Sequence, residues 1–437
     1  MKERETLKVN NLGHLEIGGC DTTELVAKYG TPLYVMDEEH IRKICRSYTE
    51  VLSKKYPDSL VCYASKAFST KAIYAICKSE SLGADVVSAG ELLTAISANM
   101  SGENLYFHGN GKTPYELQLA VDNNVHAVVV DSEFEIDLLD FICAHARKKI
   151  GVMVRVNPGI DAHTHKFIQT TKVDSKFGFS IADGTAEQII KKIREKNNLE
   201  FLGIHCHIGS QIFELTPFEL AVEKMTDFIV TLNKSGIVVK ELNLGGGYGV
   251  HYTDEDRPLE PCQYVETIVD KLNECIAVKK IKAPRLILEP GRSIVGEAGI
   301  TLSTVGALKE IKDVKKYVSV NGGMFDNPRY ALYEAKYDVA LANRMLDEKT
   351  EKVTVAGKCC ESGDMLAVDV LLPPARPGDV LAVFTTGAYN YSMASNYNRN
   401  LVPPVVLVNG GESEYIVRPQ SYEDLMARDE IPSWIKK

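Results

Sequence analysis

Short apolar runs alternate along the chain with longer segments in which apolar residues recur every three or four positions. The longer segments, such as "SEFEIDLLDFICAHARKK", have the spacing of amphipathic helices. Each short run ends in polar or glycine-rich residues, and the eight runs cover residues 60–67, 83–89, 104–110, 127–132, 150–158, 201–210, 241–249 and 285–293. Continuous apolar strands separated by helices indicate a parallel sheet that is covered on its outer face. Eight such units over about 230 residues predict an α/β fold, a TIM-like (β/α)8 barrel.

An open doubly wound sheet is the alternative fold for this alternation. It would place a GxGxxG motif at the start of the first helix, and the chain has none there. Beyond the eighth run, segments such as "KVTVAGKCC" and "DVLAVFTTGAY" are rich in strand-forming residues and are joined by Gly and Pro turns. We therefore expect a barrel domain over residues 36–295. Residues 1–35 and 296–437 would form a mainly antiparallel β-domain that completes the active site.

Composition narrows the classes of protein that fit. The 437 residues are 45% hydrophobic and 25% charged, with a formal net charge of −9, as in an ordinary globular protein. A mixed, acidic surface argues against nucleic acid or an anionic membrane as the main partner. We expect neither a membrane span nor a signal peptide, because no apolar run approaches about 18–20 residues. The ten cysteines include no CxxC pair, so we expect free thiols in a reducing cytoplasm.

Polar residues follow nearly all of the eight predicted strands. In a (β/α)8 barrel the carboxyl ends of the strands form the rim that carries function, and packing alone does not require so many polar groups there. We interpret this rim as an active site. Its members are Lys66, Asp85, Ser88, His108, Asn110, Arg155, Asn157, His205, His207, Ser210, Gly245–Gly247, Glu289, Gly291 and Arg292.

Four features of this rim favour pyridoxal 5′-phosphate as the cofactor. A lysine in a confined site can act as an amine nucleophile toward an aldehyde, and Lys66 fits that role. The glycine run 245–247 and "EPGR" at 289–292 offer unobstructed backbone N–H groups for a phosphate, although a glycine triplet can equally be a tight turn. Glu289 can pair with a protonated ring nitrogen, and His207 can lie flat against a ring.

The motifs "YASKAF", "HCHIGSQ", "NLGGGYG", "EPGRSIVG", "CCESGD" and "GAYNYSMASNYN" occur in this order along nearly the whole chain. Together they resemble the motif set of the diaminopimelate decarboxylase family, in the alanine-racemase-like, fold type III class of pyridoxal-phosphate enzymes. The resemblance implies a barrel plus a C-terminal β-domain. It also implies a cytoplasmic homodimer in which one subunit's C-terminal segment completes the partner's site, so that Cys360 and Glu361 act across the interface.

The resemblance implies individual roles for the site residues. Lys66 would bind the cofactor covalently, His207 would stack on its ring, and Glu289 would keep the ring nitrogen protonated. The phosphate would be held by Ser210, Gly247, Pro290, Gly291, Arg292 and Tyr389. Cys360 would be the acid that protonates the α-carbon. The substrate would be bound by Arg292, Arg329, Tyr333, Glu361 and Tyr389, with Glu361 recognising the distal ammonium group.

The implied reaction is decarboxylation of meso-2,6-diaminopimelate to L-lysine and CO₂, the last step of lysine biosynthesis. Glu289 favours it over racemisation, because the related racemases have an arginine at this position. A decarboxylase for lysine, ornithine or a carboxynorspermidine-type acid is the alternative. Asn321, Tyr330, Lys358 and Lys172 depart from the family pattern, and Lys358 would add a cation near the distal pocket.

Two other classes of protein compete with this interpretation. A metal-dependent barrel hydrolase would use His-x-His pairs, and the chain has "HTH" at 163–165 and "HCH" at 205–207. Such hydrolases need their His-x-His on the first strand, where this chain has Lys66. A non-catalytic pyridoxal-phosphate carrier would be short, and it would leave the C-terminal domain unexplained.

Overall fold

The computed structural model describes residues 4–160 and 176–435. Two compact units form within the chain. One comprises residues 41–250 and 257–294 and contains the barrel. The other combines the segments before residue 41 and after residue 294 with residues 251–256. Each unit is described by itself.

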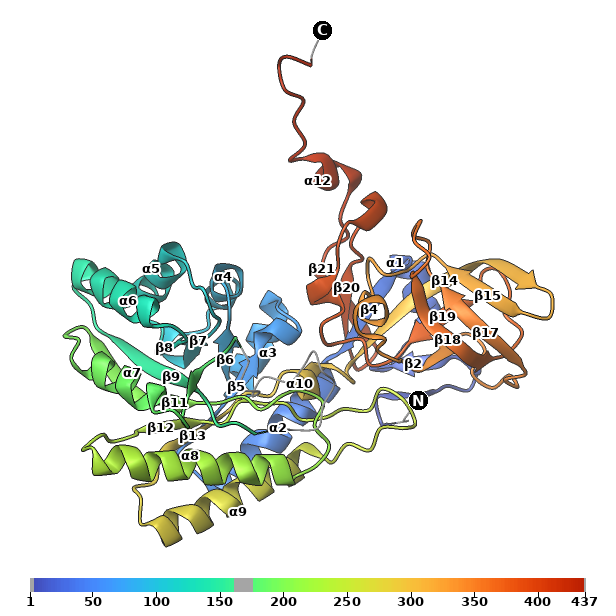
Figure 1. The fold of residues 1–437 in the computed structure, drawn as a ribbon. Coiled ribbons are helices and arrows are strands. Elements are labelled where there is room, and N and C mark those ends of the chain that lie inside the picture. Colours follow the sequence, from blue (N-terminus) through green and yellow to red (C-terminus); the bar gives the residue numbers. More distant parts are fainter. Residues whose placement is uncertain (1–3, 161–175, 436–437) are drawn as a thin grey trace. The chain divides into compact units, whose positions relative to one another are not determined.

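Eight parallel strands form a closed barrel, as the hydrophobic pattern predicts (Figure 1). Consecutive strands pair in register, and β8 pairs with β9 to close the circle, with Val130 opposite Val154. The two-residue strand β10 (Phe179–Ser180) adds to β9. The barrel strands are β5 (Ser59–Ala64), β6 (Gly83–Val86), β7 (Leu105–Phe107), β8 (Ala127–Val130), β9 (Ile150–Asn157), β11 (Leu199–His205), β12 (Glu241–Asn243) and β13 (Arg285–Leu288).

Helices connect the strands and lie around the outside of the barrel (Figure 1). In α7 (Thr185–Arg194), Ile189, Ile190 and Ile193 are buried, while the intervening cations face outward, which is the expected amphipathic pattern. The other barrel helices are α2 (Glu38–Lys55), α3 (Lys71–Ser79), α4 (Ala89–Ser97), α5 (Pro114–Asp122), α6 (Glu133–Ala146), α8 (Thr216–Lys234), α9 (Pro261–Lys279) and the short α10 (Arg292–Val295).

Side-chain caps determine where several of these helices begin. Ser88 caps α4 and Ser132 caps α6 by accepting a hydrogen bond from a backbone N–H in the first turn. Thr113 and Glu116 form a capping box at the start of α5. Ser88, predicted as a rim residue, therefore has a structural role in ending the loop after β6.

Side chains fill the interior of the barrel, so that it is a packed core and not a pore. One cluster of buried residues contains Cys62, Tyr106, Ala127, Val129, Met153, Leu202 and Ile287. At the amino end of the barrel, Glu241 accepts a hydrogen bond from the Tyr106 hydroxyl at 3.0 Å and lies 2.8 Å from Nε2 of His126. The polar groups at this end therefore satisfy one another.

The other unit is built on a mainly antiparallel sheet, as predicted. Its main path runs β18-β17-β15-β14-β4-β20-β21, with β16 and β19 attached. Two pairings are parallel, β15 with β17 and β20 with β4. The strands are β4 (Leu33–Asp37), β14 (Gly299–Ile311), β15 (Lys315–Val320), β16 (Val339–Leu341), β17 (Glu351–Ala356), β18 (Met365–Leu372), β19 (Val380–Val383), β20 (Val405–Asn409) and β21 (Glu412–Val417).

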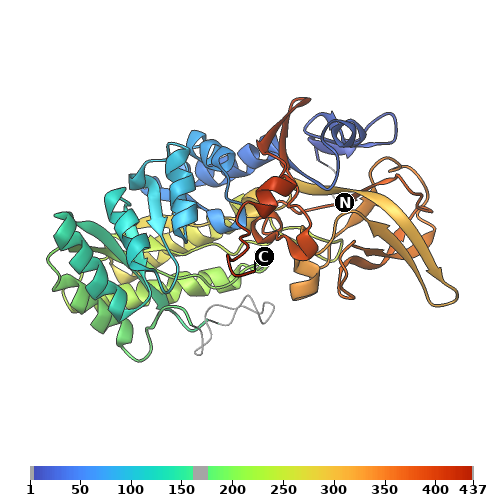
Figure 2. The same cartoon turned by 90° about the horizontal axis from the view of Figure 1, so that it is seen from above.

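Strand β4 inserts an early part of the chain into this sheet. It pairs antiparallel with β14, with Met36 opposite Gly299, and parallel with β20, with Val35 opposite Val406. The outer half of β14 is exposed, and Figure 2 shows the hairpin that β14 and β15 form. The remaining elements of this unit are β1 (Leu7–Val9), β2 (Leu15–Ile17), β3 (Cys20–Asp21), α1 (Thr22–Tyr29), α11 (Arg329–Tyr333) and α12 (Tyr422–Met426).

Within residues 4–160 and 176–435, no helix combines the length and the hydrophobicity that a membrane span requires. The longest helices, α8 and α9, have 19 residues each, and each carries several charged side chains. All ten cysteines are free thiols, and most of them are buried.

The close approach of β11 to β12 predicts a strong effect at one glycine. A Cβ atom at Gly203 would lie 1.8 Å from the carbonyl oxygen of Glu241, and backbone cannot yield as a flexible side chain can. We expect Gly203→Ala to destabilise the protein by about 1–3 kcal/mol or more, which lowers the midpoint of thermal unfolding by at least about 2–4 °C. Differential scanning calorimetry measures the change.

Gly90→Ala is the matched control for that substitution. Gly90 is exposed in the first turn of α4, and the nearest neighbour to a methyl group added there would be Ser88 Oγ at 3.7 Å. Alanine there should be neutral or should stabilise by up to about 1 kcal/mol. Equal midpoints for the two alanine variants would contradict the packing argument.

Candidate active site

Lys66 lies just beyond the carboxyl end of β5, in the short 3₁₀ turn η1 (Ser65–Ala67). Its side chain is exposed, in contrast to the buried neighbours on either side. The adjacent Ser65 hydroxyl lies 2.7 Å from the carbonyl oxygen of Asp85 and 2.8 Å from the Glu91 carboxylate. Burial raises the pKa values of Asp85 and Glu91 and lowers that of His207, and the positive charge of Lys66 acts to lower all three. The amine therefore belongs to the barrel rim.

Glycines let three rim loops pack backbone against backbone. Gly245 and Gly247 follow β12 with φ of +66° and +112°, a region that favours glycine. A Cβ atom at Gly246 would lie 2.1 Å from the carbonyl oxygen of Glu289, and one at Gly247 would lie 2.5 Å from that of Gly209. The loops after β11, β12 and β13 thus form one surface from which side chains are largely absent.

The loop after β13 is also tied to the loop that carries Lys66. The carbonyl of Pro290 accepts a hydrogen bond from the N–H of Ala64 at 3.0 Å. A Cβ atom at Gly291 would lie 2.8 Å from the Ala64 carbonyl oxygen. Arg292 is 6% exposed and donates to Ser210 Oγ from Nη2 at 3.1 Å and from Nε at 3.3 Å. A buried guanidinium and a hydroxyl therefore border the glycine surface.

The His207 ring contacts the same glycine surface. Its Nδ1 accepts a hydrogen bond from the N–H of Gly246 at 3.3 Å. Desolvation, followed by the positive charges of Lys66 and Arg155, lowers the pKa of His207 well below its usual value. A neutral imidazole can stack on an aromatic ring without carrying a buried charge.

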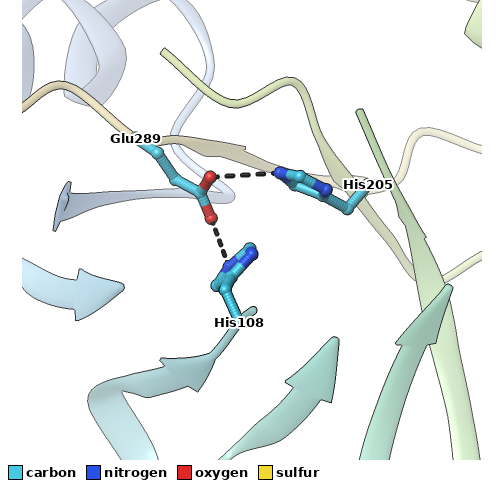
Figure 3. Close-up of side chains that lie close together, drawn as sticks. All are labelled: His108, His205 and Glu289. Carbon is cyan, nitrogen blue, oxygen red and sulfur yellow. Dashed lines mark hydrogen bonds and ion pairs between the residues drawn. The ribbon is translucent and has the colours of Figure 1, made fainter. Parts of the chain in front are cut away.

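The Glu289 carboxylate, directly after β13, lies between the His108 and His205 rings (Figure 3). Oε1 lies 2.8 Å from Nε2 of His108, and Oε2 lies 3.2 Å from Nε2 of His205. The side-chain amide of Asn243 donates to Oε1 at 2.5 Å. Burial raises the pKa of Glu289, but His108 and His205 outweigh that effect and hold the pKa well below its usual value.

These residues fit pyridoxal phosphate on the chemistry of their donors. An exposed lysine amine suits the aldehyde, and a buried carboxylate suits a protonated ring nitrogen. Backbone from which Cβ atoms are excluded, next to Arg292 and Ser210, suits a phosphate. The rim therefore offers a partner for each functional group of the cofactor.

Sequence reasoning missed three residues of this rim. Asn243 ends β12, Glu91 accepts a hydrogen bond from the N–H of Val87, and Asp131 follows β8. The position of Asp131 after the fourth apolar run was the available signal, because that run alone had no assigned rim residue. Asn243 gave no comparable signal, since an amide inside an apolar strand is indistinguishable from a structural one.

Of the two histidine pairs behind the metal hypothesis, the structure describes His205 and His207, and these two do not share a partner. His205 contacts Glu289, whereas His207 contacts Gly246. His163 and His165 lie outside the described residues, as does Lys172. Across the part of the chain that the structure describes, one group of side chains has suitable atoms within 4.8 Å of one another for a metal: His108, His205 and Glu289.

In the other unit, Arg329 is the centre of an aromatic cluster. Its guanidinium carbon lies 5.3 Å from the ring centroid of Tyr333 and 5.4 Å from that of Tyr389. Nε donates to the Tyr337 hydroxyl at 2.8 Å, and that hydroxyl donates to Asn390 at 3.2 Å. The structure thus brings together three of the predicted substrate residues, Arg329, Tyr333 and Tyr389.

Cys360 and Glu361 lie on the loop between β17 and β18, and both are exposed. The N–H of Cys360 donates to Asn398 at 2.7 Å, and the Tyr397 hydroxyl donates to Glu361 at 3.3 Å. Cys359 is half-buried, and burial followed by the nearby Asp364 carboxylate raises its pKa to about 12. The adjacent thiols therefore differ sharply in environment.

One departure from the family pattern has a structural explanation. The Asn321 amide donates to the Thr31 carbonyl at 3.0 Å, while its oxygen accepts from the N–H of Thr304 at 2.9 Å. An aspartate could accept the second bond but could not donate the first.

Known proteins resemble this chain in both sequence and structure. Residues 38–296 match the family model described as "Pyridoxal-dependent decarboxylase, pyridoxal binding domain". The diaminopimelate decarboxylase of Bacillus subtilis (strain 168) is 47% identical over 425 residues, which are 97% of each chain. The crystal structure of diaminopimelate decarboxylase from M. jannaschii has a TM-score of 0.93 at 36% identity and covers 98% of this chain and 99% of its own. Its complex with L-lysine has a TM-score of 0.92 at 36% identity and covers 98% of both chains. The chain belongs to the diaminopimelate decarboxylase family.

Proposed function

We propose that this chain decarboxylates meso-2,6-diaminopimelate to L-lysine and CO₂, the last step of lysine biosynthesis, with pyridoxal phosphate as its cofactor. The observation that carries the proposal is the ionised Glu289 at the barrel rim, between His108 and His205 and beside the glycine surface. A relative crystallised with L-lysine, the product expected here, supports the choice of substrate.

The rim residues would hold the cofactor by its aldehyde, ring and phosphate. Lys66 would bind it covalently through Nζ, and neutral His207 would stack on the ring. Glu289 would accept a hydrogen bond from the protonated ring nitrogen. The phosphate would be held by Ser210, Gly247, Pro290, Gly291, Arg292 and Tyr389.

Decarboxylation depends on where the electrons of the broken bond go. When bound, pyridoxal phosphate withdraws these electrons from the substrate's α-carbon, most strongly when its ring nitrogen is protonated. Glu289 would keep that proton in place, because a carboxylate with a low pKa stabilises a cation beside it. An arginine at this position would favour the neutral ring instead.

The substrate has a second amino-acid head, and the C-terminal unit offers groups for it. Arg329, with Tyr333 and Tyr389 against its guanidinium, would bind a carboxylate, and Arg292 would contribute from the barrel. Glu361 would accept the distal ammonium group. A diamine-forming substrate such as ornithine has no distal carboxylate and would not require the paired arginine.

Cys360 would donate the proton that replaces CO₂ at the α-carbon. It is exposed, whereas burial and Asp364 raise the pKa of Cys359. Cys359 would therefore keep its proton and serve packing.

The chain would work as a cytoplasmic homodimer that shares its active sites. Cys360 and Glu361 are exposed, and so are the apolar Leu332 of α11 and Tyr397 beside Glu361. Apolar exposure beside substrate-binding groups suits a surface that a second copy covers. Ten free thiols suit a reducing compartment, and the acidic net charge gives no support to a nucleic-acid partner.

The first prediction tests the reaction together with its substrate. The cofactor-loaded protein should release CO₂ from meso-diaminopimelate and not from lysine or ornithine. Lys66→Ala should abolish release and the covalent attachment of cofactor, which mass spectrometry after borohydride reduction measures. Lys71→Ala changes an exposed lysine five residues away and should retain both. Release from lysine or ornithine in preference to diaminopimelate would refute the substrate assignment.

The second prediction separates the two adjacent cysteines. Cys360→Ser should lower kcat by roughly 10²–10⁴-fold, as expected for loss of a general acid. Cys359→Ser should change kcat by less than a few fold and act mainly on stability. Steady-state CO₂ release gives kcat, and thermal unfolding gives stability. A larger loss of kcat in Cys359→Ser than in Cys360→Ser would show that Cys360 is not the acid.

The third prediction tests the shared site. A mixture of Lys66→Ala and Cys360→Ser proteins, refolded or exchanged together, should regain activity up to about a quarter of wild type, because half of the dimers are hybrids with one intact site. Sedimentation should give twice the chain mass. A mixture as inactive as its components, or a fully active monomer at high dilution, would contradict site sharing.

A further inference from the structure

Residues at the ends of three other barrel strands contact the Glu289 carboxylate, and Figure 3 shows two of them, His108 and His205. His108 follows β7, His205 ends β11 and Asn243 ends β12. All four side chains are almost fully buried. Their atoms meet because the barrel closes, since the three partners lie 46, 84 and 181 positions from Glu289 in the sequence.

A buried carboxylate in this setting requires compensation. Removing it from water is costly unless hydrogen bonds and opposite charges replace the lost hydration. Burial alone would raise the pKa of Glu289 and leave the group neutral. At Asp85, which is also buried at this rim, burial does raise the pKa, to about 6. His108 acts on both carboxyls, whereas Glu289 also has the shorter 2.8 Å contact with His108 and the hydrogen bonds from His205 and Asn243.

The acceptor positions of Glu289 are almost, but not completely, used. An ionised carboxylate has about four lone-pair positions on its two oxygens. Oε1 accepts a hydrogen bond from Asn243, and Oε2 accepts one from His205 at 3.2 Å. His108 Nε2 lies 2.8 Å from Oε1, within ion-pair distance but without hydrogen-bond geometry. Among the described residues, one acceptor position on Oε2 has no donor.

The imidazoles are placed to act on the carboxylate and not on each other. Their ring centroids are 4.7 Å apart with an interplanar angle of 72°, and their Nε2 atoms lie close to different oxygens of Glu289. Burial lowers the pKa of His205 to about 4, so that His205 is a neutral donor at pH 7. Asp85 Oδ1 lies 3.9 Å from His108 Nε2.

We propose that His108 and His205 are positioning residues for the cofactor: they hold Glu289 ionised and in one orientation, with one acceptor position open for the protonated ring nitrogen. This inference rests on the proposed function, because it requires pyridoxal phosphate at the rim. Loss of either imidazole returns Glu289 toward the neutral state that its burial favours. The ring nitrogen then loses its partner although Glu289 is still present.

The cofactor-loaded protein without substrate provides the first readout. Its visible absorbance spectrum reports the electronic state of the bound cofactor. We expect His108→Leu and His205→Leu to shift this spectrum in the same direction as Glu289→Gln. With meso-diaminopimelate, kcat should fall roughly 10–100-fold, as for other partners of a catalytic group, while KM changes less than about threefold. His108→Gln keeps a donor near the position of Nε2 and should restore both the spectrum and much of kcat.

The opposite end of the barrel supplies a matched control. His126 Nε2 lies 2.8 Å from Glu241 Oε1, a histidine–glutamate contact of the same length as that of His108 with Glu289. His126→Leu removes this contact far along the strands from the rim. It should lower the midpoint of thermal unfolding and leave the spectrum and kcat unchanged.

Several results would overturn the inference. A wild-type spectrum and kcat in His108→Leu would do so, as would His108→Gln that is no better than His108→Leu, or an equal spectral shift in His126→Leu. If the leucine variants do not fold, His108→Ala, made alone and in a Glu289→Gln background, decides. The inference requires that His108→Ala lower kcat in the wild-type background and cause little further loss in the Glu289→Gln background, and equal losses in the two backgrounds contradict it. Wild-type protein that takes up no pyridoxal phosphate would refute the proposed function itself, which is a separate result.

Discussion

Pairing of β8 with β9 gives each of the eight barrel strands a hydrogen-bonded neighbour on both sides. A parallel sheet that stopped at either strand would leave a row of unpaired backbone groups. Closure also forces all eight carboxyl ends onto one rim. Lys66, His207 and Glu289 are brought together by this geometry, although they come from the first, sixth and eighth barrel strands. The site therefore depends first on closure of the barrel, because no single sequence motif contains all of its residues.

The two ends of the barrel treat buried polar groups differently. At the amino end, Glu241 is satisfied by Tyr106 and His126, which closes the core. At the carboxyl end, several polar atoms, including Asp85 Oδ1 and His205 Nδ1, have no hydrogen-bond partner among the described residues. Incomplete satisfaction of buried groups lowers stability and is typical of functional sites. The same scaffold thus uses one end for stability and the other for chemistry.

The eight strands could be predicted because each is a continuous apolar run, but several ends could not. The run at 201–210 continues past the end of β11 at His205, since the following loop contains buried Cys206 and Ile208. Apolarity alone does not separate a strand from a buried loop. Rim membership followed from strand order, and so Lys66 and Glu289 were accessible to sequence reasoning. Their roles toward the cofactor stay predictions.

The contacts that tune the site were out of reach for a different reason. Whether His108 meets Glu289 or Asp85 depends on barrel radius and side-chain rotamers, which no local pattern encodes. Asn243 was missed because the sequence does not indicate that its amide donates a hydrogen bond to Glu289. Arg329 and Tyr389 were predicted through the family resemblance alone. Tyr389 also has a positive φ, which its sequence context does not indicate. Secondary-structure propensity does not specify these contacts, because they depend on the positions of residues far apart in the sequence.

The pairing of strand β4 sets the order in which its sheet can form during synthesis on the ribosome. Its partners are β14 and β20, and the β20 contact at Val408 is more than 370 residues downstream of the start of β4 at Leu33. At about 5–20 residues per second, β4 waits roughly 20 to 75 s for that partner to be synthesised. The barrel segments emerge in the interval and can fold with contacts that are complete by residue 294. Because β14 follows the barrel directly, β4 can pair with β14 first, but its other edge stays open until β20 is made. A newly made chain therefore carries an open strand edge after its barrel is complete, and chaperone binding would protect that edge from pairing with another chain.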